Sequence, residues 1–279
     1  MGRAHRLGKS VYYDMDDFIF EYDKIKNLSF LQGKDYKSFE KYSADIKLAM
    51  SLCDGYIVST EAMKKAVEAS FPEKAVYTNR NVASQAMFIC ASKYQKEEQR
   101  QENDKIYLGY FSGTKTHNED FESIKDQLLE IMKRNENVYL LIGGQIQLPE
   151  DFDEVKKRIE RFRFVAWRSL PHLIAKADIN LMPLEDTEFH NCKSENKWME
   201  AAMVGVPTVA SWNTELERVI SNGVDGYLCK TKEEWVENLQ SLIDDVNLRK
   251  KIAEAAREKV WKDYTTLHME QDVLDALIR

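Results

Sequence analysis

The sequence predicts an α/β protein with parallel sheets, and three observations carry this prediction. Short β-prone runs alternate along the chain with amphipathic segments of roughly 8–15 residues, which is the pattern of βαβ units. The 279 residues suffice for one large domain or two modest ones, and with 43% hydrophobic residues they can bury a substantial core. No apolar run in the sequence approaches the roughly 18–20 residues that a membrane-spanning helix needs.

The first 95 residues carry few regular elements. The expected strands are Ser10–Tyr13, Gly55–Ser59 and Ala75–Thr78. The expected helices are Tyr36–Leu52 and Glu61–Ser70, and Thr60 is placed to cap the second one. The polar run Tyr94–Asp104 then predicts an exposed connection and a domain boundary.

After this boundary the alternation becomes regular. The expected strands are Lys105–Phe111, Asn137–Gly143, Phe162–Ala166, Asp178–Met182, Thr208–Ser211 and Gly226–Cys229. The expected helices are Phe121–Lys133, Phe152–Arg161, Pro171–Lys176, Glu195–Val204, Glu215–Ser221, Lys232–Asp245, Asn247–Asp263 and Thr266–Ile278. A parallel α/β sheet binds ligands at the carboxyl ends of its strands, so the loops there are where we expect a site.

Composition and spacing narrow the function classes. The formal net charge of −7 argues against broad nucleic-acid binding, which normally needs a basic face. The four cysteines (Cys53, Cys90, Cys192 and Cys229) form no CxxC pair and fit a reduced cytosolic protein. The five histidines show neither HxxxH nor HExxH spacing, so the sequence does not predict a zinc site.

A first candidate loop runs from Gly109 to Asn118. It leaves a strand, turns through Gly113 and enters a helix, and backbone N–H groups at such a turn can approach a phosphate. Lys115 or His117 could add a further donor. An ordinary strand-to-helix turn is the alternative interpretation.

A second candidate loop, Pro183–Ala202, feeds the next helix. Ser194 is a plausible N-terminal cap, and the ammonium of Lys193 could neutralise a diphosphate there. Glu200 lies in the helix, where its carboxylate could accept two hydrogen bonds from a vicinal diol such as a ribose. The alternative is that Lys193 and Glu200 are solvated helix charges.

The stretch Pro183–Ser211 (PLEDTEFHNCKSENKWMEAAMVGVPTVAS) resembles the donor-binding half of retaining glycosyltransferases of the family 4 group, which have the two-domain GT-B fold. The family motif is Glu-x7-Glu followed by EA-x-x-x-G-x-P-x-V-A-S. The matching residues here are Glu200, Ala201, Ala202, Gly205, Pro207, Val209, Ala210 and Ser211. Less specific similarity to the family extends over YDMDD, CDGYIVSTEAM, GYFSGTKTHNEDF, ADINLMPL and ELERVISNGVDGYLC. The resemblance therefore covers nearly the whole chain.

The resemblance implies roles for individual residues. The expected catalytic residues are Lys193 and His117, and the expected donor-binding residues are Gly113, Lys115, Ser194, Glu195, Asn196 and Glu200. Glu200 would hold the donor ribose, and the others would contact the diphosphate. One departure stands out: Cys192 occupies the position of the first motif Glu, and Lys193 is a hypothetical compensating cation.

The cluster Asp14, Asp16 and Asp17 follows the first expected strand. A DxD can bind Mn²⁺ with a nucleotide diphosphate in the other glycosyltransferase architecture, GT-A. GT-B enzymes generally use cationic side chains and helix dipoles, so the resemblance implies neither a metal nor a cofactor. An acceptor-side role at the cleft edge and a capped strand end with solvated carboxylates remain as alternatives.

The combined expectation is a GT-B protein of two Rossmann-like lobes. Residues 1–95 would form an incomplete N-terminal, acceptor-side lobe and residues 96–264 the donor-binding lobe, while a helix over 265–279 would cross back to the N-terminal lobe. The expected function is retaining transfer of a sugar from a nucleotide-diphosphate sugar to a hydroxyl acceptor, in bacterial surface polysaccharide or glycoconjugate synthesis.

Three points stay open at this stage. The alternative functions are a nucleotide-sugar-binding lobe without activity of its own and a GT-B-type sugar-nucleotide epimerase or hydrolase. The acceptor could be a saccharide, a lipid-linked sugar or a protein. A cytoplasmic location is expected, with peripheral association at the inner face of the membrane, or a partner domain completing the N-terminal lobe, as further options.

Overall fold

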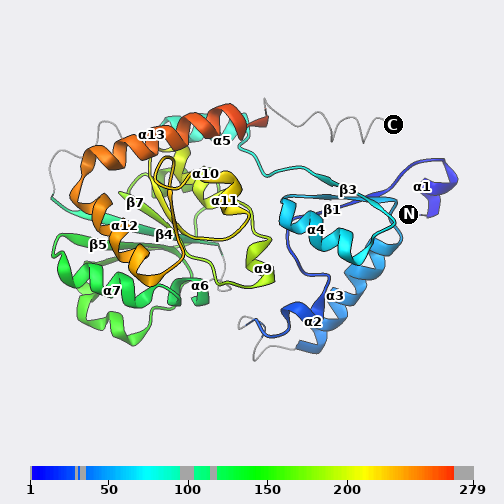
Figure 1. Cartoon of the computed structure of the whole chain (residues 1–279), viewed down its shortest axis with the longest axis horizontal. Helices are drawn as coiled ribbons and strands as arrows, with labels where there is room; N and C mark the ends of the chain where they lie inside the picture. Colours follow the sequence, from blue (N-terminus) through cyan, green and yellow to red (C-terminus); the bar gives the residue numbers. More distant parts are fainter. Residues whose placement is uncertain (1, 29–30, 32–35, 95–103, 114–117, 267–279) are drawn as a thin grey trace. The chain divides into compact units, whose positions relative to one another are not determined.

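The computed structural model describes residues 2–28, 31, 36–94, 104–113 and 118–266. It divides into two compact units, Met1–Asn81 with Asp186–Ser194 and Val82–Glu185 with Glu195–His268 (Figure 1). The division between the units falls after Asn81, earlier than the predicted boundary at residue 95. The expected crossing helix over 265–279 lies almost wholly outside the described residues.

The first unit is built on a parallel sheet in the order β1-β2-β3, with strands β1 (Tyr12–Met15), β2 (Gly55–Val58) and β3 (Ala75–Thr78) among the described residues. Its helices are α1 (Gly2–Arg6), α2 (Tyr22–Ile25), α3 (Tyr36–Ser51), α4 (Glu61–Ser70) and α9 (Glu188–Asn191). Thr60 caps α4 as predicted, because its hydroxyl accepts a hydrogen bond from the Met63 N–H at 3.1 Å. The core of this unit includes Phe18, Phe20, Met50, Tyr56 and Val67.

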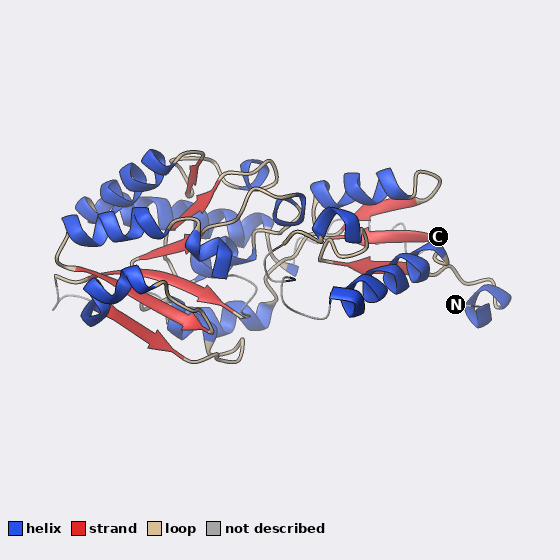
Figure 2. Ribbon diagram, turned by 90° about the horizontal axis from the view of Figure 1, so that it is seen from below, coloured by secondary structure: helices blue, strands red, loops and turns tan. Residues whose placement is uncertain are grey.

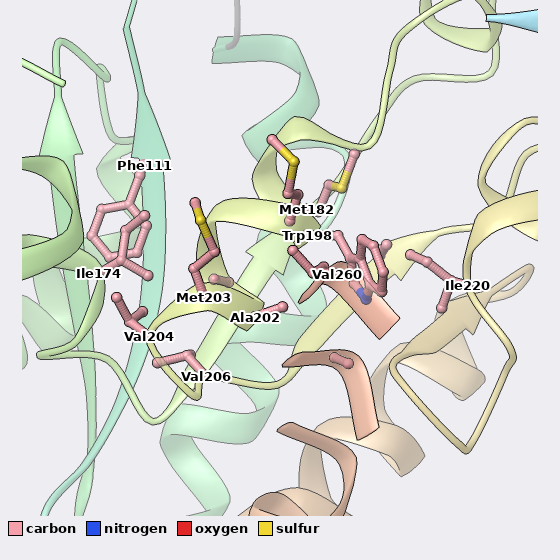
Figure 3. Close-up of a cluster of buried hydrophobic side chains, with 14 of the residues drawn as sticks. Phe111, Ile174, Met182, Trp198, Ala202, Met203, Val204, Val206, Ile220 and Val260 are labelled. Carbon is pink, nitrogen blue, oxygen red and sulfur yellow. The ribbon is translucent and has the colours of Figure 1, made fainter. Parts of the chain in front are cut away.

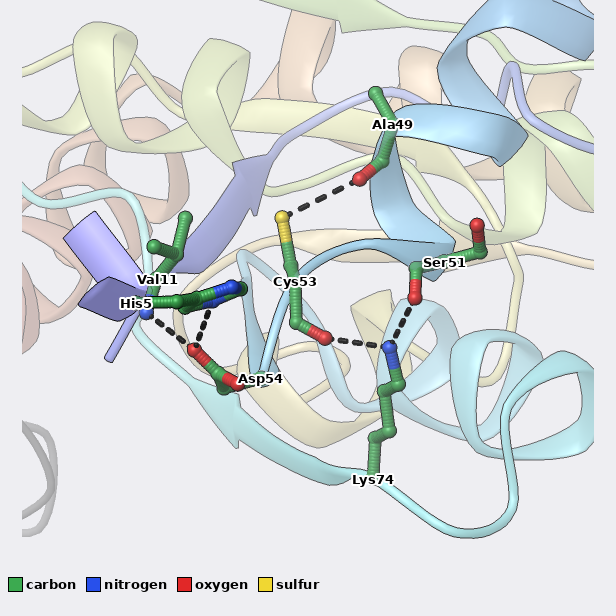
Figure 4. A network of polar contacts seen from close by, with 7 residues as sticks. All are labelled: His5, Val11, Ala49, Ser51, Cys53, Asp54 and Lys74. Carbon is green, nitrogen blue, oxygen red and sulfur yellow. Dashed lines mark hydrogen bonds and ion pairs between the residues drawn. The ribbon is translucent and has the colours of Figure 1, made fainter. Parts of the chain in front are cut away.

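A polar network joins the amino ends of these strands (Figure 4). The carboxylate of Asp54 accepts the Val11 N–H at 2.7 Å and lies 3.0 Å from His5 Nε2. The Val11 N–H holds the pKa of Asp54 below its usual range. Lys74 Nζ donates to the carbonyls of Ser51 and Cys53 at 2.5 Å each, where a cation is favoured beside the helix's terminal carbonyls. This network is structural and lies at the edge of the sheet opposite the one that binds ligands in α/β proteins.

The second unit contains a six-stranded parallel sheet in the order β6-β5-β4-β7-β8-β9 among the described residues. Its strands are β4 (Ile106–Ser112), β5 (Val138–Gly144), β6 (Ile159–Phe162), β7 (Ile179–Met182), β8 (Thr208–Ser211) and β9 (Tyr227–Cys229). In chain order this is 3-2-1-4-5-6, the arrangement of a doubly wound dinucleotide-binding sheet. The Rossmann-like sheet predicted for this part of the chain is confirmed.

Helices cover both faces of this sheet (Figure 2). They are α5 (Gln85–Ser92), α6 (Asn118–Glu122), α7 (Lys125–Arg134), the 3-10 helix η4 (Glu150–Arg158), α8 (Leu170–Ile174), α10 (Asn196–Met203), α11 (Leu216–Val219), α12 (Lys232–Asp244) and α13 (Val246–Asp263). Alternate residues of each strand face opposite layers. In β4, Leu108 and Tyr110 pack toward the layer containing α7 and α12, whereas Phe111 packs toward α8 and α10.

The layer with α8, α10 and α13 forms a dense apolar cluster (Figure 3). Trp198 and Met199 of α10 are 0% and 2% exposed and belong to this cluster. The indole Nε1 of Trp198 donates to the Asp225 carbonyl at 2.7 Å, which satisfies the polar atom of the buried ring.

The structure corrects several local predictions. The first strand, expected at Ser10–Tyr13, is β1 at Tyr12–Met15, so Asp14 lies within the strand and not after it. The expected helix Phe152–Arg161 is the 3-10 helix η4, and the strand expected at Phe162–Ala166 is β6, three residues earlier at its start. The expected helix Phe121–Lys133 is interrupted at Ser123, whose hydroxyl donates to the Asp120 carbonyl. Among the described residues, no helix is long and apolar enough to cross a membrane.

Candidate functional site

The sheet order of the second unit places a switch point between β4 and β7. These neighbouring strands pair at Leu108 with Ile179 and Gly109 with Asn180, and the connections that leave them turn toward opposite halves of the sheet. Ligands of doubly wound sheets bind outside the carboxyl ends of the strands at such a point. The two loops that the sequence analysis selected begin here, after Ser112 and after Met182.

The loop after β4 carries Gly113, which is exposed. A Cβ added there would meet Phe164 at 3.8 Å, an ordinary contact, so glycine leaves open space at this position rather than relieving a clash. The predicted residues Lys115 and His117 lie outside the described residues, and their roles stay predictions.

The loop after β7 is fixed from two sides. The Leu184 N–H donates to Ser211 Oγ at 2.9 Å, and the Glu185 N–H donates to the Asp120 carboxylate at 3.1 Å. Burial raises the pKa of Glu185, and the nearby Asp120 carboxylate adds to this effect. These two hydrogen bonds connect the loop to α6 and to the end of β8. They fix the path of the backbone at Leu184 and Glu185, beside the switch point.

Helix α10 begins beside this loop, and here one prediction is wrong. The N-terminal cap position of α10 is Glu195, not Ser194, and no side chain caps the helix by a hydrogen bond. Ser194 stands one residue before the cap position, and its hydroxyl accepts a hydrogen bond from Asn81 Nδ2 at 2.9 Å. Glu195 is 1% exposed, and Asn196 is the first helical residue.

Glu200 lies one turn into α10, as predicted, and is partly buried. Desolvation raises the pKa of Glu200 to about 7, and the ammonium of Lys197 opposes this rise. A carboxylate that is poorly solvated and has both oxygens available can gain from hydrogen bonds with a ligand's hydroxyls. The site therefore has an acceptor of the kind that a ribose diol requires.

Lys193 belongs to the first unit together with the three predicted acidic residues. Its Nζ lies 2.6 Å from Asp17 Oδ1 and 4.4 Å from the centre of the Phe189 ring. Asp16 accepts a hydrogen bond from Asn81 at 2.9 Å. Asp14 is largely exposed on β1, but partial desolvation of its carboxylate and the nearby charge of Asp16 raise its pKa.

Sequence reasoning missed Asn81, which contacts both Asp16 and Ser194. Its position in the sequence could have indicated it, because Asn81 follows β3 at the carboxyl edge of a parallel sheet, where ligand-binding residues lie. Within the described residues, no group of three or more His, Cys, Asp or Glu side chains is arranged to hold a metal ion.

A further cavity of about 700 Å³ lies in the second unit, away from these loops. Phe88 and Ile89 of α5 and Trp261 of α13 line it, together with Met203. None of the predicted site residues lines this cavity, and it lacks the position at the carboxyl ends of the strands that marks α/β ligand sites.

Comparison with known proteins gives one family match. The model of the family described as "Glycosyl transferase-like" matches residues 125–275, more than half of the chain. No curated protein matches the sequence significantly.

Several solved glycosyltransferase structures have a similar fold. HepE from Anabaena, solved in complex with UDP and glucose, superposes with a TM-score of 0.70 at 15% identity, over 98% of this chain and 73% of that one. TarM superposes with a TM-score of 0.69 at 15% identity, over 96% of this chain and 50% of that one. Sucrose-phosphate synthase from Thermosynechococcus elongatus superposes with a TM-score of 0.62 at 13% identity, over 95% of this chain and 66% of that one.

At these identities the superpositions establish the fold, which is the GT-B fold that the sequence predicted. The family match covers α7 to α13, which includes the loop after β7 and the whole of α10. The chain thus belongs to the glycosyl transferase-like family, and it is a GT-B glycosyltransferase of the group 1 type.

Proposed function

We propose that this enzyme transfers a sugar from a nucleotide-diphosphate sugar to a hydroxyl acceptor with retention of configuration. The observation that carries the proposal is the switch point between β4 and β7, where the Gly113 loop and the loop leading to Glu200 begin. The HepE structures with UDP and with UDP-glucose support the choice of donor class.

The proposed roles follow from the chemistry of each group. Glu200 accepts hydrogen bonds from the donor ribose, and the diphosphate lies near Gly113 and the start of α10, where backbone N–H groups and the helix dipole favour an anion. Lys115, Ser194, Glu195 and Asn196 complete the proposed donor site by contacting the diphosphate, and His117 is, with Lys193, a proposed catalytic residue. Catalysis then rests on positioning and on stabilising the negative charge of the departing diphosphate, with Lys193 as the cation.

We further propose a role in bacterial surface polysaccharide or glycoconjugate synthesis, which rests on the resemblance of Pro183–Ser211 to enzymes of that setting. The exposed carboxylate of Asp14 is the proposed acceptor-side group. Neither a metal nor a cofactor is part of the proposal.

The test is a calorimetric titration of the whole chain with UDP, GDP and dTDP, followed by a turnover assay with UDP-glucose as the first donor. Saturable binding of one nucleotide and donor consumption that requires a hydroxyl acceptor support transfer. The anomeric configuration of the product, read by NMR, decides retention. Binding without turnover in a broad acceptor screen would favour a donor-binding lobe, and acceptor-independent consumption would favour a hydrolase.

A substitution of Glu200 tests whether this residue binds the ribose. We expect Glu200→Gln to weaken nucleotide binding, while Glu237→Gln, an exposed change on α12 of the same unit, leaves it unchanged. Equal affinities of the two variants would show that the ribose does not lie on Glu200.

A further inference from the structure

The segment Asp186–Ser194 belongs to the first unit, although it stands in sequence between β7 and α10 of the second. The chain leaves the second unit after Glu185 and returns to it at Glu195. Phe189 and Cys192 of this segment are 8% and 3% exposed and belong to the apolar core of the first unit. The segment is therefore anchored by burial and is not a free loop.

Two polar contacts hold the segment Asp186–Ser194 to other parts of the first unit. The buried hydroxyl of Thr60 donates to the Cys192 carbonyl at 3.1 Å. At the other end, Lys24 Nζ pairs with Glu188 at 2.5 Å. Because Thr60 also caps α4, the segment is held by a residue that is itself fixed by a helix terminus.

The last two residues of the segment are the ones to which the proposed function assigns diphosphate contacts, Lys193 and Ser194. Each is held by a residue near the carboxyl edge of the first unit's sheet: Lys193 by Asp17 at 2.6 Å, and Ser194 by Asn81 at 2.9 Å. Asn81 donates at the same time to Asp16, so both protons of its amide are engaged.

The direction of the Asn81 bond has a chemical consequence. A serine hydroxyl has one proton to donate and two lone pairs that accept. Since Ser194 Oγ accepts from Asn81, its proton remains for another acceptor, and among the described residues no acceptor for it is found. An anionic phosphate oxygen is an acceptor that suits this proton.

The contact with Asp17 restrains the ammonium group of Lys193. The side chain of Lys193 is only 23% exposed, with its ammonium over the Phe189 ring and against the Asp17 carboxylate. A long lysine side chain held on two sides loses less conformational freedom when it binds an anion. Asp17 therefore restrains the ammonium of Lys193 before any anion binds.

We propose that Asp17 and Asn81, with Asp16 behind Asn81, are positioning residues that orient Lys193 and Ser194 toward the diphosphate of the donor. This inference rests on the proposed function, and it gives Asp16 and Asp17 a donor-side role in place of acceptor contact. It predicts that residues preceding the second unit in sequence control nucleotide affinity.

Double-mutant cycles test this, with the affinity for UDP measured by calorimetry, or for whichever nucleoside diphosphate the unmodified chain binds. We expect Asn81→Ala to weaken binding about tenfold, the size of one good hydrogen bond to a charged group. In a Ser194→Ala background the same change should have no further effect. Asp17→Asn should likewise weaken binding on its own and have no further effect in a Lys193→Met background.

Asp23→Asn is the matched control, because Asp23 also pairs with a lysine of the first unit, Lys26 at 2.9 Å, and is exposed. It should bind as the unmodified chain does. Circular dichroism confirms folding of each variant, and Asn81→Ser and Asp17→Glu replace any variant that fails to fold.

The outcomes separate the two ideas. If the unmodified chain binds none of UDP, GDP and dTDP, the proposed function is wrong and the inference is wrong with it. If it binds one of them, and Asn81→Ala and Asp17→Asn match the Asp23→Asn control, only the positioning inference is wrong. Fully additive losses in both cycles would also overturn it, because they would show that Asn81 and Asp17 do not act through Ser194 and Lys193.

Discussion

Replacing Glu200 by Gln should make the protein more stable at pH 8, although it removes a proposed ligand contact. Desolvation raises the pKa of Glu200 from 4.5 to about 7. Each tenfold change in proton affinity corresponds to about 1.4 kcal/mol, so an ionised Glu200 costs about 3 kcal/mol of folding free energy. Gln keeps the shape of the side chain and carries no charge to desolvate.

The pH dependence has a definite sign. The folded chain holds the Glu200 proton more tightly than the unfolded chain does, so ionisation favours the unfolded state. The cost is absent below about pH 4.5, grows as pH rises toward 7 and is complete above it. The stability gain of Glu200→Gln should follow the same course.

Thermal unfolding followed by tryptophan fluorescence at pH 5, 6, 7 and 8 measures this. A change of about 3 kcal/mol corresponds to roughly 6–12 °C in Tm for a unit of this size. Glu237→Gln, exposed on α12, should show no such trend. An equal Tm difference between Glu200→Gln and the unmodified chain at pH 5 and pH 8 would refute the reasoning, because a cost caused by ionisation must vanish when the group is protonated.

Three further substitutions probe the packing of the second unit. Gly144 has φ +104° and a Cβ there would lie 1.8 Å from the Ser112 carbonyl oxygen, so Gly144→Ala should lower the unfolding free energy by about 3 kcal/mol or more. Gly205 has φ +74° but open space around it, so Gly205→Ala should cost only about 1 kcal/mol, and urea denaturation distinguishes the two. Trp198→Phe should cost about 2–3 kcal/mol in the same assay, because it leaves the Asp225 carbonyl without its indole donor and opens a gap in the core; a loss below 0.5 kcal/mol would contradict this.

Regular elements with a strong apolar pattern could be predicted from the sequence almost to the residue. Strands β2, β3 and β8 have the predicted bounds, except that β2 ends at Val58 and not at Ser59. Continuous apolar runs bounded by turn residues have few alternative structures. The segment Glu150–Arg158 could not be predicted in this way. It buries Phe152 and Val155, whose spacing of three residues fits a 3-10 helix as well as an α-helix.

The site was only partly predictable for a different reason. Glu200 and Gly113 lie where the strand–loop–helix pattern puts them, since the pattern fixes which residues follow the carboxyl end of a strand. The partners of Lys193 and Ser194 are 176 and 113 residues away in sequence. A local pattern has no information about such pairs, so the sequence suggested a capping role for Ser194 and gave no sign of its bond to Asn81.

The surroundings of Cys192 explain why a thiol stands where the family motif has its first carboxylate. The side chain is 3% exposed within the core of the first unit, and its carbonyl is bonded to the buried hydroxyl of Thr60. A carboxylate at this depth would have to lose its hydration among apolar side chains, at a cost of several kcal/mol unless paired. Anchoring the segment by Cys192 and presenting a motif carboxylate from the same position are therefore incompatible in this arrangement. The chain keeps the anchor, so under the proposed function any contact that a carboxylate at this position would make with the transferred sugar has to come from another residue.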